Sequence, residues 1–79
     1  MKKYNLIIGI PSYNNEKTIG FVRNQVIKGL KKYYPQKKAL ILNVDGGSLD
    51  DTRRVFLSIK VPKNIFLELR KRILLHKKD

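Results

Sequence analysis

Two apolar runs, separated by one amphipathic segment, organise the first half of the chain. The runs cover residues 4–10 and 38–44, and nearly every position within them is apolar. Continuous runs of this length are typical of strands that are buried on both faces, as in parallel sheets. Pro11 is expected to end the first strand because proline has no amide hydrogen to donate to the ladder. The sequence Asp45-Gly46-Gly47 is expected to end the second strand.

Between the two runs, apolar residues recur with the spacing of one helix face. They are Ile19, Val22, Val26, Ile27, Leu30, Tyr33 and Tyr34, and basic or amide residues occupy the other face. Asn14 or Asn15 is expected to cap the start of this helix, and Pro35 to end it. Gly20 and Gly29 weaken a helix by about 1 kcal/mol each relative to alanine. We expect them to bring the helix close to the sheet.

The second half of the chain predicts two further helices. A short one runs from residue 49 to about residue 58, where Ser48 and Asp51 have the spacing of a capping box. Residues 59–61 are a candidate stub of strand that ends at Pro62. Asn64 is expected to cap a third, basic helix that continues to about His76, although its apolar residues fall on two sides.

A strand–helix–strand unit with one crossover predicts a right-handed pair of parallel strands. The predicted fold is therefore α/β: an incomplete Rossmann-like β-α-β unit over residues 1–58, with a C-terminal basic helix in a tail over residues 59–79. So small a sheet leaves its edges open and its faces uncovered. We therefore expect a fragment, a truncated reading frame, or a chain that completes its sheet with a second copy or with the remainder of an enzyme.

Composition narrows the classes of partner. The 79 residues carry a net charge of +12, and basic residues dominate residues 53–79, where Glu68 and Asp79 are the acids. Nucleic acid, an anionic membrane surface or a phosphorylated substrate are therefore candidate partners. The chain has no cysteine, which is compatible with a cytoplasmic location, and no apolar run approaches the roughly 20 residues of a membrane span.

Two polar blocks carry the candidate chemistry. Residues 8–15 read Ile-Gly-Ile-Pro-Ser-Tyr-Asn-Asn, and residues 44–52 read Val-Asp-Gly-Gly-Ser-Leu-Asp-Asp-Thr. Each follows a predicted strand and precedes a predicted helix. In a parallel unit both blocks would lie side by side at the carboxyl ends of the strands, where open α/β sheets bind nucleotides.

Over about residues 4–58 these blocks resemble family 2 glycosyltransferases, which have the A-type glycosyltransferase fold. The form Asp45-Gly46-Gly47-Ser48 is most similar to the branch that includes glucosyl- and mannosyl-phosphoglycerate synthases. The resemblance implies that the two turns bind the nucleoside diphosphate of a UDP- or GDP-sugar. Either block alone is a weak signal, whereas the ordered pair at this spacing is fairly specific.

The resemblance assigns a role to each nucleotide-binding candidate. Tyr13 would stack on the base, Pro11 and Ser12 would hold the turn, and Asn15 would contact the ribose or base. Asp45 would accept a hydrogen bond from the ribose or base, and Gly46 with Gly47 would let the backbone approach the ligand closely.

Each candidate also has a purely structural interpretation. Tyr13 can be an aromatic packed on the turn, the two asparagines can be caps, and Asp45 can shape an Asx-turn. Gly46 and Gly47 can be turn glycines, and Asp50 and Asp51 are expected to be charges that favour a helix start. His76 is expected to be an exposed, structural histidine.

Several departures from the family pattern bear on catalysis. Gly46 stands where many members carry a second acid, Leu49 where threonine is usual, and Asp51 where glycine is usual. The family's metal-binding Asp-x-Asp, which holds Mg²⁺ or Mn²⁺, has no counterpart after residue 52. We therefore assign no catalytic residue, no metal ligand and no cofactor, and expect the chain to bind nucleotide without transferring sugar alone. A basic binder of nucleic acid or an anionic surface is the main alternative.

Overall fold

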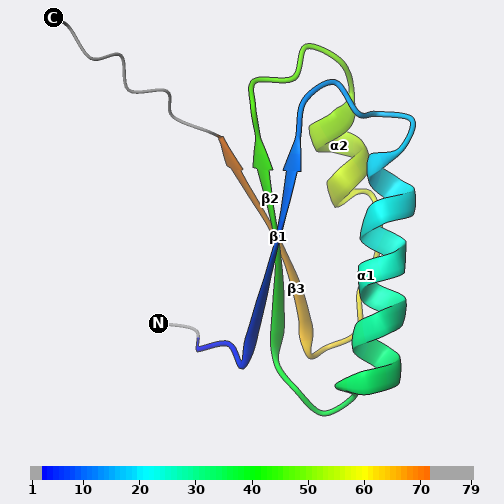
Figure 1. Cartoon of the computed structure of the whole chain (residues 1–79), viewed down its shortest axis with the longest axis vertical. Helices are drawn as coiled ribbons and strands as arrows, with labels where there is room; N and C mark the ends of the chain where they lie inside the picture. The colour runs from blue at the N-terminus through cyan, green and yellow to red at the C-terminus, as the bar shows by residue number, and fades with distance from the viewer. Residues whose placement is uncertain (1–2, 72–79) are drawn as a thin grey trace, which may run out of the picture.

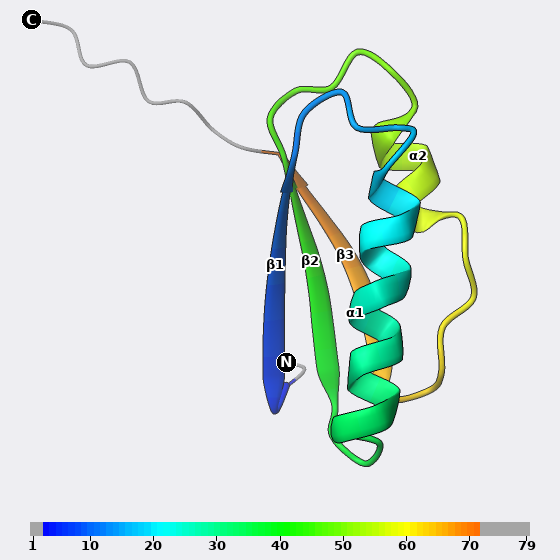
Figure 2. The same cartoon turned by 45° about the vertical axis from the view of Figure 1, so that its right-hand side comes forward.

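The computed structural model describes residues 3–71 and consists of alternating strands and helices. Their order is β1 (Leu6–Ser12), α1 (Ile19–Tyr33), β2 (Ala39–Asp45), α2 (Thr52–Leu57) and β3 (Ile65–Lys71). The strands form one parallel sheet in the order β1-β2-β3. Both helices lie on the same side of the sheet (Figures 1 and 2). The chain is thus a small α/β protein, and its architecture is compatible with a partial β-α-β unit.

The largest correction concerns the predicted C-terminal basic helix. Residues 65–71 form β3 instead, whereas residues 72–79, including Arg72 and His76, lie outside the described residues. Ile65, Leu67 and Leu69 pair with the helix-facing positions of β2, and Phe66, Glu68 and Arg70 pair with the other face. This alternation has the two-residue period of a strand. The segment forms a strand because its backbone can hydrogen-bond to the free edge of β2.

The ends of the other elements also differ from the sequence prediction. β1 continues through Pro11 to Ser12, which is tolerated because β1 is an edge strand of the described sheet. α1 starts at Ile19 rather than directly after the asparagines, and the backbone oxygen of Asn15 accepts from the Ile19 amide at 2.8 Å. Residues 59–61 form no strand.

The predicted capping box at the second helix is wrong. α2 begins at Thr52, several residues later than expected, and the residue before it, Asp51, makes no side-chain cap. The Ser48 side chain instead bonds with Asp45 and with the amide of Asn14. The local signal failed because Ser48 has partners elsewhere in the fold that a helix start does not offer.

The core lies between the sheet and the two helices. Its buried apolar side chains come from all five elements: Ile10, Ile19, Ile27, Leu30, Ala39, Ile41, Phe56 and Ile65. Neither helix glycine is needed for close packing. A Cβ on Gly20 would make ordinary contact with Val55 at 3.5 Å, and one on Gly29 would meet nothing within 4 Å.

A buried arginine joins the two helices. Arg23 of α1 is 5% exposed, and its guanidinium donates to the backbone oxygens of Val55 (2.6 Å) and Phe56 (3.0 Å) near the end of α2. Burial lowers the pKa of Arg23 from its ordinary value. These bonds cap the last turn of α2, where the Val55 oxygen also accepts from the Ser58 amide at 3.2 Å, and they hold α2 in place.

The opposite face of the sheet has no helix over it within the described residues (Figure 2). Ile7 on this face is 63% exposed, and Leu42 and Val44 are partly exposed beside it. Between residues 3 and 71, no helix is both long enough and apolar enough to cross a membrane.

Candidate functional site at the carboxyl edge of the sheet

Two loops meet where β1 and β2 end. Residues 13–18 connect β1 to α1, residues 46–51 connect β2 to α2, and both lie at the same end of the sheet in Figures 1 and 2. Ser12 is opposite Asp45 in the strand register, so the loops leave the sheet at the same level. We call these two loops the crest. The crest and the strand ends beneath it contain the residues that the sequence singled out for nucleotide binding.

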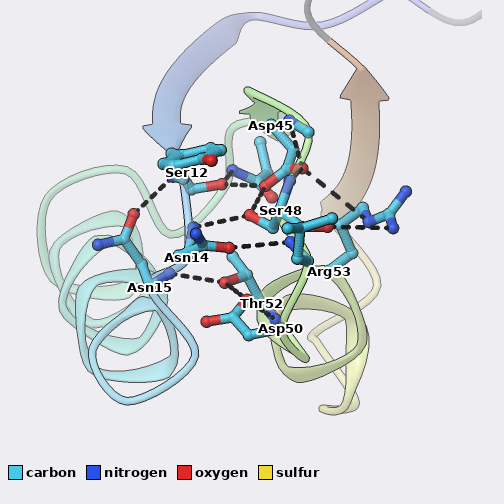
Figure 3. A network of polar contacts seen from close by, with 12 residues as sticks. Ser12, Asn14, Asn15, Asp45, Ser48, Asp50, Thr52 and Arg53 are labelled. Atoms are coloured by element: carbon cyan, nitrogen blue, oxygen red, sulfur yellow. Dashed lines mark hydrogen bonds and ion pairs between the residues drawn. The ribbon is translucent and has the colours of Figure 1, made fainter.

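Asp45, the last residue of β2, lies directly beneath the crest and is fully buried (Figure 3). Its Oδ1 accepts from the hydroxyls of Ser12, at 2.8 Å, and Ser48. Its Oδ2 accepts from the amides of Gly47 (3.0 Å) and Ser48 (2.7 Å), which forms an Asx-turn. Four donors therefore occupy a carboxylate that has about four acceptor positions.

These bonds control the ionisation of Asp45. Burial alone would raise the pKa of the carboxyl group, but hydrogen bonds from Ser48, Ser12 and Gly47 outweigh it and lower the pKa to about 2. The pKa of Asp50 is also lowered: burial again opposes the shift, and bonds from Thr52 and the Glu16 amide prevail. Both carboxylates are therefore charged and internally bonded at neutral pH.

Acid is expected to destabilise the fold through Asp45. Its folded pKa lies below its unfolded pKa, so its contribution is complete above about pH 5 and is lost as the pH falls from about 4 to 2. The drop from 3.8 to about 2 corresponds to about 2.5 kcal/mol. Urea unfolding followed by circular dichroism between about pH 7 and pH 2.5 tests this. A free energy of unfolding that stays constant over this range would contradict it.

Asn14 links the two loops from both its backbone and its side chain. Its amide donates to the Ser48 hydroxyl (2.9 Å), and its Oδ1 accepts from the Leu49 amide (2.9 Å). Its backbone is left-handed, with φ at 51°, a conformation that asparagine adopts more readily than most residues. Asn14 is therefore a loop-to-loop connector and not the expected helix cap.

Asn15 and Asp50 add further links between the loops. The Asn15 amide donates to the Thr52 hydroxyl at 2.7 Å, and the Glu16 amide donates to Asp50 Oδ2 at 3.2 Å. The Asn15 side chain accepts from the Tyr13 amide at 2.7 Å, so it closes its own turn and does not cap α1. Asp50 likewise accepts from Thr52, which explains its place before α2.

The structure brings most predicted nucleotide-binding residues together. Ser12, Tyr13, Asn15, Asp45 and Gly46 all lie at the crest or directly beneath it, and the Gly46 amide donates to the Ser12 oxygen at 2.8 Å. A Cβ on Gly46 would lie 3.4 Å from that oxygen and 3.5 Å from the Tyr13 ring, so Tyr13 and Gly46 are neighbours. Pro11 is the exception: it is exposed, and strand alternation places it on the opposite sheet face from Ser12.

Asn43, Thr52 and Arg53 also belong to the network, and none of them was assigned a role from the sequence. The Asn43 amide group donates to the Ile10 oxygen and to Ser12 Oγ, both at 2.9 Å, and its Oδ1 has no hydrogen-bond partner among residues 3–71. Thr52 is fully buried, and Arg53 lies 3.9 Å from Asp45. Asn43 could have been identified from the sequence, because it is a polar residue within an otherwise apolar predicted strand.

Gly47 is the crest residue whose backbone requires glycine. Its φ is 97°, in the left-handed region that side chains disfavour, although a Cβ there would meet nothing within 4 Å.

Within the described residues, no group of three or more histidine, cysteine or acidic side chains could hold a metal ion. Comparison with protein families, with curated proteins and with solved structures finds no match to this chain.

Proposed function

We propose that the crest binds the nucleoside diphosphate of a UDP- or GDP-sugar. One observation carries this proposal: two blocks that resemble the donor-binding turns of family 2 glycosyltransferases lie together at the carboxyl ends of adjacent parallel strands. Ligands of open α/β sheets bind at this edge. The proposed ligand class follows from the resemblance, and the geometry supports it by joining blocks that are about 30 residues apart in sequence.

Tyr13 is the proposed contact for the base. Its side chain is 58% exposed, and it sits beside Gly46, which has no side chain to cover the ring. An exposed aromatic face provides about 1–3 kcal/mol when a base stacks on it. Its backbone is held by Asn15, so the turn that presents the ring is fixed before a ligand arrives.

In the proposed site, Asp45 holds the nucleotide-binding turns in place and does not itself contact the ligand. The sequence interpretation gave its carboxylate to the ribose or base, but a ligand hydroxyl would have to displace one of four internal donors. The more economical role is to hold the Gly46–Gly47 turn against Ser12. Because Asp45 and Asp50 are both engaged in this way, we propose binding for this chain and not sugar transfer.

Replacing Tyr13 with alanine is expected to weaken nucleotide binding by about 5- to 150-fold, the equivalent of one lost stacking contact. Amide NMR titration of the whole chain with UDP and with GDP measures this. Tyr13→Phe keeps the ring and should bind as the native chain does. Tyr33→Ala is the matched control, because Tyr33 is similarly exposed (67%) but lies at the far end of α1.

Absence of any shift at Tyr13, Gly46 and Gly47 with both nucleotides would overturn the proposal. A shift at other residues that is unchanged in Tyr13→Ala would place the nucleotide elsewhere.

A polyanion-binding function is the second candidate, and it has its own observation. A groove of about 280 Å³ between α1 and the chain that follows α2 has Ile27, Ile59 and Pro62 in its lining, together with Lys28, Lys31 and Lys60. These lysines have no acidic partner among residues 3–71. This function would be favoured if an oligonucleotide changed the NMR signals of these lysines and its affinity fell steeply with added salt.

A further inference from the structure

The first four backbone amides of each crest loop already have acceptors. On the first loop these are the amides of Tyr13, Asn14, Asn15 and Glu16, and on the second those of Gly46, Gly47, Ser48 and Leu49. Phosphates bound by α/β proteins are commonly held by free amides of such loops. Here the amides nearest the strand ends are occupied, so a phosphate beside Asp45 must find its donors on side chains.

Arg53 has such donors. Its side chain is 48% exposed, and it comes from the first turn of α2 toward Asp45 (Figure 3). Its Nε is 3.9 Å from Asp45 Oδ2, and its Nη2 is 3.4 Å from the Ser48 oxygen, which is a long contact. The structure records no acceptor for its Nη1 among residues 3–71. The guanidinium is thus held near the crest with donors to spare.

The saturation of Asp45 explains why Arg53 keeps these donors. A carboxylate and a guanidinium normally form two parallel hydrogen bonds, which would use the fork of the arginine. Ser12, Gly47 and Ser48 have already taken the oxygens of Asp45. The carboxylate therefore attracts Arg53 and positions it, but does not consume its hydrogen-bonding capacity.

The neighbouring cations do not share the environment of Arg53. Arg54, the next residue in α2, is paired with Asp51 at 2.9 Å. Lys71, at the end of β3, is opposite Asp45 in the strand register but borders the groove on the helix-free face of the sheet, together with Val44 and Arg70. The diphosphate contact is therefore assigned to Arg53 alone.

We propose that Arg53 binds the diphosphate of the nucleotide in place of backbone amides. This inference rests on the proposed function. Tyr13 follows the last residue of β1, and Arg53 lies against Asp45 at the end of the adjacent strand β2, so a ligand that contacts both side chains must reach across the Asp45–Gly46 turn. A nucleoside diphosphate has its base at one end and its charge at the other, whereas a nucleoside has no group for Arg53.

Calorimetric titration of the full chain with UDP and uridine, and with GDP and guanosine, tests the inference. The native chain should bind the diphosphate at least about tenfold more tightly than its nucleoside. Arg53→Gln should remove this difference and leave nucleoside binding unchanged, and Arg53→Lys should lie between. Arg54→Gln is the matched control and should bind both ligands as the native chain does. Added salt should weaken diphosphate binding more than nucleoside binding.

The outcomes separate the two proposals. Equal affinity of the native chain for diphosphate and nucleoside, or unchanged diphosphate affinity in Arg53→Gln, would overturn the role of Arg53 and leave the nucleotide site in place. Binding of neither ligand would overturn the proposed function and this inference with it. If Arg53→Gln does not keep the native circular dichroism spectrum, the role of Arg53 is tested with Arg53→Lys. The affinities of the native chain for diphosphate and nucleoside then give the second test.

Discussion

Asp45→Asn is expected to lower the free energy of unfolding by about 2–4 kcal/mol, the effect of leaving one or two buried donors without an acceptor. The asparagine has nearly the same shape, but its amide group would face donors that now bond to a carboxylate oxygen. Gly47 and Ser48 both donate their amides to Oδ2, and Ser12 donates its hydroxyl to Oδ1. One or more of these buried donors would lose its acceptor.

This loss is large for a chain of this size. Native proteins have about 0.05–0.15 kcal/mol of stability per residue, which is about 4–12 kcal/mol for 79 residues. Urea unfolding at pH 7 measures the effect, with Asp51→Asn as the matched control because Asp51 is exposed and pairs only at the surface. The variant should also lose most of the acid sensitivity between about pH 4 and 2. A loss below about 1 kcal/mol would mean that the Asp45 network does not stabilise the crest.

The first half of the fold was predictable because its signals are local and strong. The apolar runs at β1 and β2, the stripe of Ile19, Ile27 and Leu30, and the glycines after Asp45 each determine structure within a short window. The right-handed crossover rule then predicts the parallel pair without further information. The same reasoning predicted that the two polar blocks meet at one edge of the sheet, which the structure confirms.

β3 was not predictable in the same way. Its residues contain two partial patterns: Ile65, Phe66, Leu69 and Ile73 have helical spacing, and Ile65, Leu67 and Leu69 alternate. What selects the strand in residues 65–71 is the free edge of β2, which is a partner more than 20 residues away in sequence. A short apolar segment with both periods depends on its tertiary partner more than on its propensity.

The hydrogen-bond network of the crest was also beyond the sequence. Ser12 and Asp45 are 33 positions apart, and their bond depends on a register that aligns their side chains on one face. Asn14, Asn15 and Ser48 were given the usual cap roles, yet they bond across the loops. Short polar side chains accept any nearby donor, so only the relative position of the loops decides between a cap and a cross-link.

Phe56→Ala should lower the free energy of unfolding by about 3–5 kcal/mol, because it leaves a cavity under α2. Phe56 has 0% exposure and is the largest fully buried side chain among residues 3–71. α2 has six residues, too few to be stable as an isolated helix, so packing must hold it. Leu57→Ala is the matched control, because Leu57 is the next residue in α2 and is 48% exposed.

This effect should extend from α2 to the crest. Asp50 and Thr52 accept bonds from the loop that follows β1, and Arg53 of α2 lies 3.9 Å from Asp45 at the end of β2. Amide hydrogen exchange should therefore show loss of protection at residues 46–57 that is at least as large as the loss in β2. Faster exchange confined to α2, with the crest still protected, would show that the loop-to-loop bonds hold without it. Nucleotide affinity in Phe56→Ala should fall together with crest protection, because the proposed diphosphate contact, Arg53, is carried by α2 itself.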